Sequence, residues 1–340
     1  MTLEHAVALS LLNDRLPRVG LTARLLSDDP ELLELAAPLI DEARVTRRRA
    51  EEGGIGALAW NDPTFPPLLA AIPDCPPVLW YRGDLATLQA PMVAIVGSRA
   101  ASSVAIDTAT RLAADLAARG VTVVSGLARG VDSAAHRGAL TRGRTIAVLG
   151  SGVDYIYPSE HKPLAAQIAE AGLVVSEYAP GVPPLPHHFP LRNRVISGLS
   201  LGVVVIEASE KSGSLITAGC ALEQGREVMA VPGNVLSGRN RGGHALLKDG
   251  AKIVETADDI IEGLAWDRPG EPEASPSAAA GSADPVLRAM VVDQPYDLDA
   301  LALGSGLDMP RLLPRLVELE LAGLVRRQDG GRFVRPSRTC

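Results

Sequence analysis

Short runs of apolar, mostly β-branched residues alternate with longer segments of helical spacing between positions 92 and 262. Such alternation is typical of a parallel sheet that helices cover on both faces, with right-handed crossovers between the strands. It predicts an α/β fold in which residues 57–262 form an extended Rossmann-like, doubly wound domain. The first part of this domain, residues 57–91, is rich in proline, so we expect it to extend the sheet irregularly at one edge.

The amino-terminal part of the chain follows a different pattern. Residues 1–56 show helical spacing in LEHAVALSLL and again in one long amphipathic segment that starts at Asp28 or Asp29. This pattern predicts a small helical domain. Two interpretations stay open, namely a SAM-like or helix-hairpin-helix-like interaction domain and a cap that packs on the main domain.

The carboxyl-terminal part divides into a linker and a further domain. Residues 263–284 are rich in Pro, Ser, Ala and acidic residues without periodicity, which indicates a flexible linker. Residues 285–340 predict three helices and a β-hairpin with its turn at Asp329-Gly330, the order of a winged-helix domain. The third helix mixes arginine with glutamate and proline, which makes it a poor reader of the major groove. The arginines of the hairpin leave open a contact with duplex DNA, with a single strand or with a protein.

Five of the apolar runs in the central domain end in turns rich in Gly, Ser, Asn or Arg. Ligands of an open parallel sheet bind outside the carboxyl ends of its strands, so these turns should share one rim. Glycine lets backbone amides approach an anion closely, and a following helix adds its positive end. One mononucleotide needs one or two such loops, whereas five indicate a longer polyanion such as a nucleic-acid strand. The turns are 97–99, 125–130, 150–152, 211–214 and 232–234.

Charge narrows this interpretation to a local patch. The formal net charge of −7 argues against a protein that is basic all over. Residues 90–262 hold 16 basic and 16 acidic side chains, and seven of the basic ones lie in or beside the loops of the rim. A single arginine in a loop is as often merely solvated, but the grouping favours a binding patch. The seven are Arg99, Arg129, Arg192, Arg194, Lys211, Arg239 and Arg241.

The cysteines indicate a reducing compartment, and the hydropathy of the chain indicates no membrane span. Cys75, Cys220 and Cys340 are far apart and make no metal-ligand spacing, so we expect reduced thiols and no metal. The amino terminus lacks the basic start of a signal peptide, and no apolar stretch approaches the roughly 18 residues of a membrane span. We therefore expect a cytoplasmic protein without membrane insertion.

The motifs argue against the common nucleotide-dependent enzymes. The turn after the first strand is Gly-Ser-Arg rather than G-x-G-x-x-G, and Ser125 stands where NAD enzymes place an acid. The chain also lacks a phosphate-binding G-x-x-x-x-G-K-[ST] motif. We therefore expect no cofactor. Gly213-Ser214 with Thr217 is similar to the phosphate-binding helix start of nucleotide-processing Rossmann enzymes, which keeps a phosphoribohydrolase-like nucleotide hydrolase as the alternative function.

The segment HHFPLRNRVISGLS carries the most specific chemistry. Arg192 and Arg194 place two guanidinium groups around the amide of Asn193, a set suited to phosphate. The alternative is that the two arginines form salt bridges with Glu177 and Glu207, and the sequence does not decide between them.

Aromatic residues offer a stacking surface for bases. Phe189 precedes the arginines and could stack on a base, which is worth about 1–3 kcal/mol in single-strand binders. It could equally belong to the core. Tyr155 and Tyr157 are the other aromatic candidates near the rim, in a chain with only 11 aromatic residues.

Six segments in fixed order resemble the DprA/Smf family, the DNA-processing proteins of bacterial natural transformation. The likeness runs through the whole of residues 92–262, and the helical start and winged-helix tail match the family's architecture more loosely. The segments are GSRAAS (97–102), SGLARGVDSAAHRGAL (125–140), AVLGSGVDYIYPSEH (147–161), HFPLRNRVISGLS (188–200), SGSLITAGCALEQGREVMAVPGN (212–234) and LLKDGA (246–251).

The resemblance implies a protein without enzymatic activity that binds single-stranded DNA, and possibly duplex DNA, in the basic rim. It also implies a homodimer through the Rossmann domain and loading of the RecA recombinase onto the bound strand. The family often carries a lysine three residues before the phenylalanine; here Pro186 stands there, followed by His187, which is charged mainly below about pH 6.5. The expected DNA-binding residues are Gly97, Ser98, Arg99, Arg129, His187, Phe189, Arg192, Asn193, Arg194, Lys211, Ser212, Gly213 and Ser214.

Overall fold

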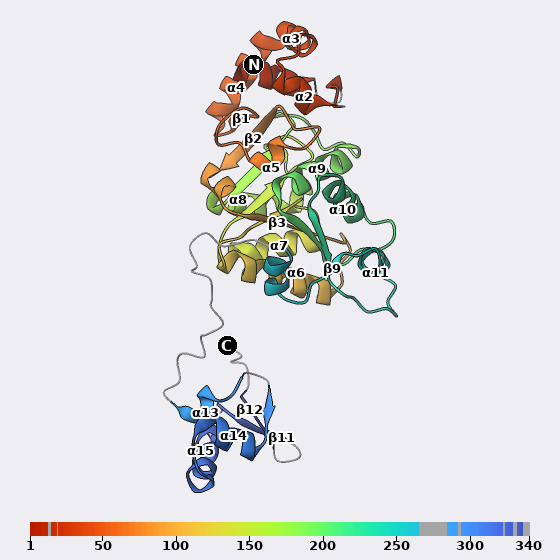
Figure 1. The fold of residues 1–340 in the computed structure, drawn as a ribbon. Coiled ribbons are helices and arrows are strands. Elements are labelled where there is room, and N and C mark those ends of the chain that lie inside the picture. Colours follow the sequence, from red (N-terminus) through yellow and green to blue (C-terminus); the bar gives the residue numbers. More distant parts are fainter. Residues whose placement is uncertain are drawn as a thin grey trace. The chain divides into compact units, whose positions relative to one another are not determined.

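The computed structural model describes residues 1–12, 15–18, 20–264, 284–291, 294–321, 324–328 and 332–335. The chain divides into two compact units, Met1–Trp266 and Asp267–Cys340 (Figure 1). The expected linker, residues 263–284, falls almost entirely outside the described residues.

A nine-stranded sheet forms the centre of the first unit, in the order β1-β2-β6-β5-β4-β3-β7-β8-β9. The strands from β3 onward pair in parallel, and β1 and β2 add to β6 as an antiparallel edge. This confirms the predicted doubly wound sheet, and β1 and β2 lie in the segment expected to extend it. The strands are β1 (Gly56–Ala59), β2 (Val78–Gly83), β3 (Met92–Val96), β4 (Thr122–Ser125), β5 (Thr145–Val148), β6 (Leu173–Ser176), β7 (Gly202–Val205), β8 (Glu227–Ala230) and β9 (Lys252–Ile253).

The strand order reverses beside β3. The chain passes from β3 through β4 and β5 to β6 in one direction, then returns and places β7 on the other side of β3. In doubly wound sheets the ligand crevice lies at such a reversal, outside the carboxyl ends of the strands. The helices that follow the strands are α6 (Ser103–Ala118), α7 (Val131–Leu140), α8 (Lys162–Ala171), α9 (His188–Leu199), α10 (Gly213–Glu223), α11 (Arg241–Lys248) and α12 (Ala257–Gly263).

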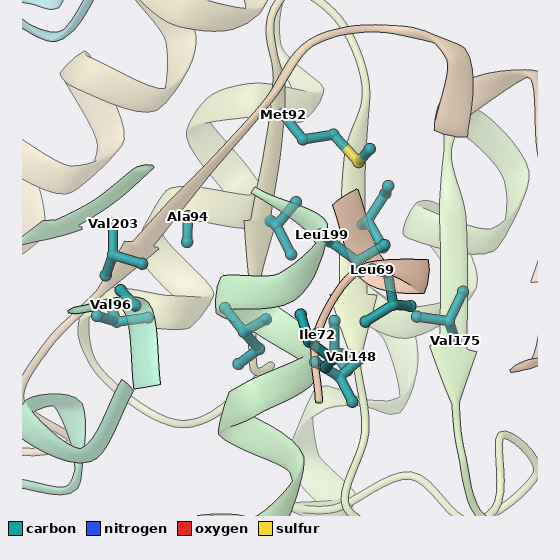
Figure 2. Close-up of a cluster of buried hydrophobic side chains, with 14 of the residues drawn as sticks. Leu69, Ile72, Met92, Ala94, Val96, Val148, Val175, Leu199 and Val203 are labelled. Atoms are coloured by element: carbon teal, nitrogen blue, oxygen red, sulfur yellow. The ribbon is translucent and has the colours of Figure 1, made fainter. Parts of the chain in front are cut away.

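The strands from β3 to β7 are buried on both faces because they are largely apolar on both sides. Ala94 and Val96 of β3 belong to the cluster under α9, whereas Val93 and Ile95 pack under α6 and α7. Figure 2 shows the cluster under α9, in which Leu199 of that helix lies with Leu69 of the short helix α5 (Pro67–Ala70), with Ile72 just after it, and with strand residues such as Val148 and Val175. This packing fixes the position of α9 on the sheet.

Helices α1 (Leu3–Leu11), α2 (Leu21–Leu26), α3 (Pro30–Ala36) and α4 (Ile40–Glu52) form the amino-terminal part. The expected long helix is divided between α3 and α4 by a 3₁₀ turn at Ala37–Leu39, because the proline at position 38 cannot continue α-helical bonding. Asp29 is the N-cap of α3, and Asp28 instead accepts a bond from the amino-terminal nitrogen at 2.6 Å.

These helices share one hydrophobic cluster with the edge of the sheet. Leu9 of α1 and Leu32 of α3 pack in the same cluster as Trp80 of β2 and Ile168 of α8. Trp80 also donates a hydrogen bond from Nε1 to the Oγ of Ser10, at 3.3 Å. The packing is that of a cap on the α/β domain.

The second unit has winged-helix order. It contains α13 (Pro285–Arg288), β10 (Pro295–Tyr296), α14 (Leu298–Ser305), α15 (Met309–Leu321), β11 (Arg326–Gln328) and β12 (Arg332–Val334). The three strands form a sheet in the order β10-β12-β11. The hydrophobic core of this unit includes Leu301, Leu312 and Phe333. The expected turn at Asp329-Gly330 lies outside the described residues.

Candidate nucleic-acid interface

A cavity of about 480 Å³ opens at the strand reversal, outside the carboxyl ends of β3 and β7. We call it the phosphate pocket. The loop after β3 contributes Gly97, Ser98 and Arg99, and the start of α10 contributes residues 212–214 and Thr217. The two motifs that the sequence predicts to hold phosphates therefore line one cavity, as the strand order requires.

The loop after β3 is held close to its neighbours. The backbone nitrogen of Ser98 donates to the carbonyl of Glu207 at 2.7 Å, and the carbonyl of Ser98 accepts from Val131 at 3.2 Å. A Cβ at position 97 would lie 2.7 Å from Val131 Cγ2, so only glycine fits there. This anchoring leaves the side chain of Arg99 exposed at the mouth of the pocket.

The start of α10 is a capped helix end. Ser212 is the N-cap, and its Oγ accepts from the backbone nitrogen of Ser214 at 3.4 Å. Asn193 of α9 donates from Nδ2 to the carbonyl of Gly213 at 3.2 Å, which ties α9 to the helix start. Helix amino ends attract anions, so this end of α10 supports phosphate binding in the pocket.

Arg192 and Asp132 form the floor of the phosphate pocket. The guanidinium of Arg192 is buried and donates to the carbonyls of Gly126, at 3.0 Å, and Val148. Burial lowers the pKa of Arg192 to about 10, so it stays charged at neutral pH. Asp132 Oδ2 accepts from the backbone of Gly126 at 3.1 Å and Ala128 at 3.3 Å, and burial raises the pKa of this carboxyl. Arg192 thus lines the pocket and at the same time binds the chain segments after β4 and at the end of β5.

A smaller hollow of about 60 Å³ adjoins the phosphate pocket, and we call it the aromatic hollow. Its walls include the rings of Phe189 and Tyr157, whose centroids lie 5.4 Å apart. Arg99 lies over the Phe189 ring at 5.5 Å and, with Ala128 and Arg192, lines both cavities. Phe189 is half-buried at the rim, so the alternative of a core phenylalanine is wrong. Of the two candidate tyrosines, Tyr157 lines this hollow.

Arg129 also lines the aromatic hollow, but its guanidinium already has a partner. Its Nε and Nη2 donate to the two carboxylate oxygens of Glu160, at 2.6 and 2.8 Å. The hydrogen bonds raise the pKa of Arg129 and lower that of Glu160. Both side chains are more than half exposed, so an incoming phosphate would compete with Glu160 for this arginine.

Arg194 does not line the pocket, which corrects the expectation that it contacts DNA. Its side chain is 7% exposed, with Nη2 2.6 Å from Glu177 Oε2 and Nε 2.9 Å from Asp74 Oδ2. Arg18 reaches the same oxygen of Glu177 at 2.7 Å. The alternative of a salt bridge to Glu177 is therefore correct for Arg194. Glu207, the other acid named there, accepts from Ser102 instead.

Two further expected residues lie outside both cavities. His187 is exposed at the start of α9, with its ring 4.6 Å from that of His188. Lys211 is exposed in the loop before α10. It lines a third hollow with Arg239 and Arg241. The structure thus brings most of the expected residues to one rim and separates Arg194 from it.

Comparison with known sequences assigns the family. Residues 56–265 match the family described as DNA recombination-mediator protein A, and residues 270–331 match the DprA winged helix domain. The chain belongs to the DprA family. Protein Smf of Escherichia coli K12 is 45% identical over 285 residues, which cover 81% of this chain and 76% of Smf. DprA of Streptococcus pneumoniae R6 is 44% identical over 223 residues, or 65% of this chain and 78% of that protein.

Two solved DprA structures are similar to this DprA-family chain. The X-ray structure of DprA from S. pneumoniae superposes with a TM-score of 0.66 at 36% identity, over 77% of this chain and 98% of that one. DprA from Helicobacter pylori, whose structure concerns its single-stranded DNA binding mode, gives a TM-score of 0.57 at 30% identity, over 62% and 95%.

The DprA-like motifs occupy the rim itself. Segments 97–102, 125–140, 147–161, 188–200 and 212–234 each contribute residues to one of the hollows. The resemblance therefore covers the surface that the loops build as well as the core of the sheet. Within the described residues, no helix of this DprA-family chain is long and apolar enough to cross a membrane.

Proposed function

We propose that this protein binds single-stranded DNA along the rim, without sequence preference and without enzymatic turnover. It acts in the cytoplasm as a homodimer through the α/β domain, protects the strand and passes it to the RecA recombinase in natural transformation and recombination. The single-stranded DNA binding mode of the H. pylori relative supports the ligand. The dimer and the recombinase follow from the family resemblance.

The main support for this function is that the phosphate pocket and the aromatic hollow adjoin each other. The phosphate pocket offers the β3 loop and the start of α10, and the aromatic hollow beside it offers Phe189 and Tyr157. Arg99 belongs to both. A phosphate site directly joined to a stacking surface fits a nucleotide within a strand, whose base stacks while its phosphate is held. His187, which is exposed at the start of α9, would add a further contact with the strand.

The test is fluorescence anisotropy with labelled oligo-dT of increasing length at two salt concentrations. A strand binder gains affinity from a mononucleotide to about a decamer, and its log K falls with log salt by about 0.7 for each phosphate neutralised. Phe189→Leu should weaken binding by about 5- to 150-fold, the equivalent of losing a stacked base, while the salt slope stays unchanged.

A different result would favour the alternative. Tight binding of a mononucleotide with no gain from length, together with release of a free base, would indicate a phosphoribohydrolase-like enzyme in the phosphate pocket. Recombinase transfer is tested separately, by the rate at which RecA forms filaments on a strand that the protein already covers. A rate equal to that on a strand coated with an unrelated single-stranded-DNA-binding protein would contradict the mediator role.

A further inference from the structure

The rim continues beyond the phosphate pocket into a third hollow of about 410 Å³, which we call the basic hollow. Ser209 lines both cavities, so the two adjoin. The basic hollow contains three cationic side chains and one carboxylate, that of Glu210, and no aromatic residue lines it. The cationic residues are Lys211, Arg239 and Arg241.

A buried asparagine fixes the loop that carries two of these cations. Asn240 is 3% exposed; its Oδ1 accepts from the backbone of Ala208 at 2.9 Å and its Nδ2 donates to the carbonyl of Val231 at 2.9 Å. The loop is thereby bound to the ends of β7 and β8. Arg239 and Arg241, on either side of Asn240, are presented from a fixed backbone.

The charges of the basic hollow are weakly compensated. Arg241 lies 3.9 Å from Glu210, with both side chains 68% exposed, and surface pairs of this kind contribute about 0–1 kcal/mol. Among the described residues no acid lies within ion-pair distance of Lys211. Arg239 donates to the carbonyl of Ala100 at 3.1 Å, next to Arg99 in the loop after β3.

Arg241 also stands at an electrostatically unfavourable position for the fold. It is the first residue of α11, where the helix dipole disfavours a positive charge. An arginine there, beside two other cations, contributes little to stability, but it suits an anion that binds from solvent. Because charged and hydroxyl side chains line the hollow and no ring does, it fits the phosphodiester backbone rather than a base.

We infer that the basic hollow is a second phosphate site for the DNA strand, contacted by Lys211 and Arg241. The strand then runs from the aromatic hollow through the phosphate pocket to the loop after β8. This inference rests on the proposed function and adds the route of the strand along the rim.

Arg241→Ala tests the inference by anisotropy with oligo-dT of about 4 and about 15 nucleotides. Binding of the longer strand should weaken more than binding of the shorter one, and its salt slope should fall by about 0.7, which is one phosphate contact. Arg241→Lys should keep that slope because the charge remains. The free energy of unfolding should not fall in Arg241→Ala, since the substitution removes a charge that the helix dipole disfavours.

The matched control is Arg142→Ala. Arg142 is an exposed arginine in the turn that leads into β5, so it lies at the amino ends of the parallel strands, opposite the rim. Its loss should leave both affinities and both slopes unchanged. If Arg241→Ala behaves like this control while the wild-type protein binds, the second site is refuted and the proposed function stands. If the wild-type protein binds neither oligonucleotide, the proposed function itself fails.

Discussion

Replacing Arg194 and Arg99 by alanine, one at a time, should distinguish an arginine that stabilises the fold from one that binds DNA. Arg194 and Glu177 are 7% and 5% exposed, so loss of the guanidinium leaves a carboxylate in the interior. Removing one member of a buried pair costs about 3–5 kcal/mol. Arg18 stays with Glu177, and Asp74 is 29% exposed and regains water. We therefore expect a loss at the lower end, about 3 kcal/mol.

Arg99→Ala should have the opposite profile. Its side chain is exposed and lies over the Phe189 ring, so its loss should lower the free energy of unfolding by less than about 1 kcal/mol. DNA binding, however, should lose about 0.7 from the slope of log K against log salt, because one phosphate contact disappears. Arg194→Ala, at a temperature where it is folded, should keep the wild-type slope.

Two measurements check both profiles. Urea denaturation followed by tryptophan fluorescence reports on the first unit, because all three tryptophans lie at or before position 266. Anisotropy with oligo-dT over a range of salt concentrations gives the slope. A reduced slope in Arg194→Ala, equal to that in Arg99→Ala, together with an unchanged urea midpoint, would contradict the structural role of Arg194.

Two further substitutions test the ion pair at the rim and a buried histidine. Glu160→Gln should raise DNA affinity about two- to fivefold by releasing Arg129, and a gain of the same size in an Arg129→Ala background would contradict this. Burial lowers the pKa of His136 to about 3, against about 6.5 in the unfolded chain, so as pH falls from about 6 to 4 only the unfolded state gains this proton. The free energy of unfolding should then fall by about 1.4 kcal/mol per pH unit more than in His136→Gln, measured by urea denaturation, and equal pH slopes would exclude the effect.

The sheet and its rim could be predicted because their signals are local. Each strand is a short apolar run followed by a glycine-rich turn, and the geometry of parallel sheets then places those turns at one edge. That Arg192 lines the pocket while Arg194 does not could also be predicted from the local sequence. Residues two apart on a helix point in different directions, so the two guanidinium groups could not face one pocket once the segment was helical.

Other features depend on contacts between distant segments. Arg194 pairs with Asp74 and Glu177, and no pattern around position 194 indicates which acids lie nearby. Tyr157 reaches Phe189 because the loop after β5 and the start of α9 meet at the rim. The division of the amino-terminal helix, by contrast, was readable from the proline at position 38, which ends an α-helical run.

The antiparallel edge of the sheet has a consequence for synthesis of the chain on the ribosome. β2 ends at Gly83, yet its partner β6 is complete only at Ser176, so β2 emerges roughly 90 residues before the strand it pairs with. At a synthesis rate of about 5–20 residues per second, Trp80 and its apolar neighbours stay unpaired with β6 for on the order of 5–20 s. During that interval the amino-terminal helices are the cover available to this strand, which gives them a protective role before the sheet exists.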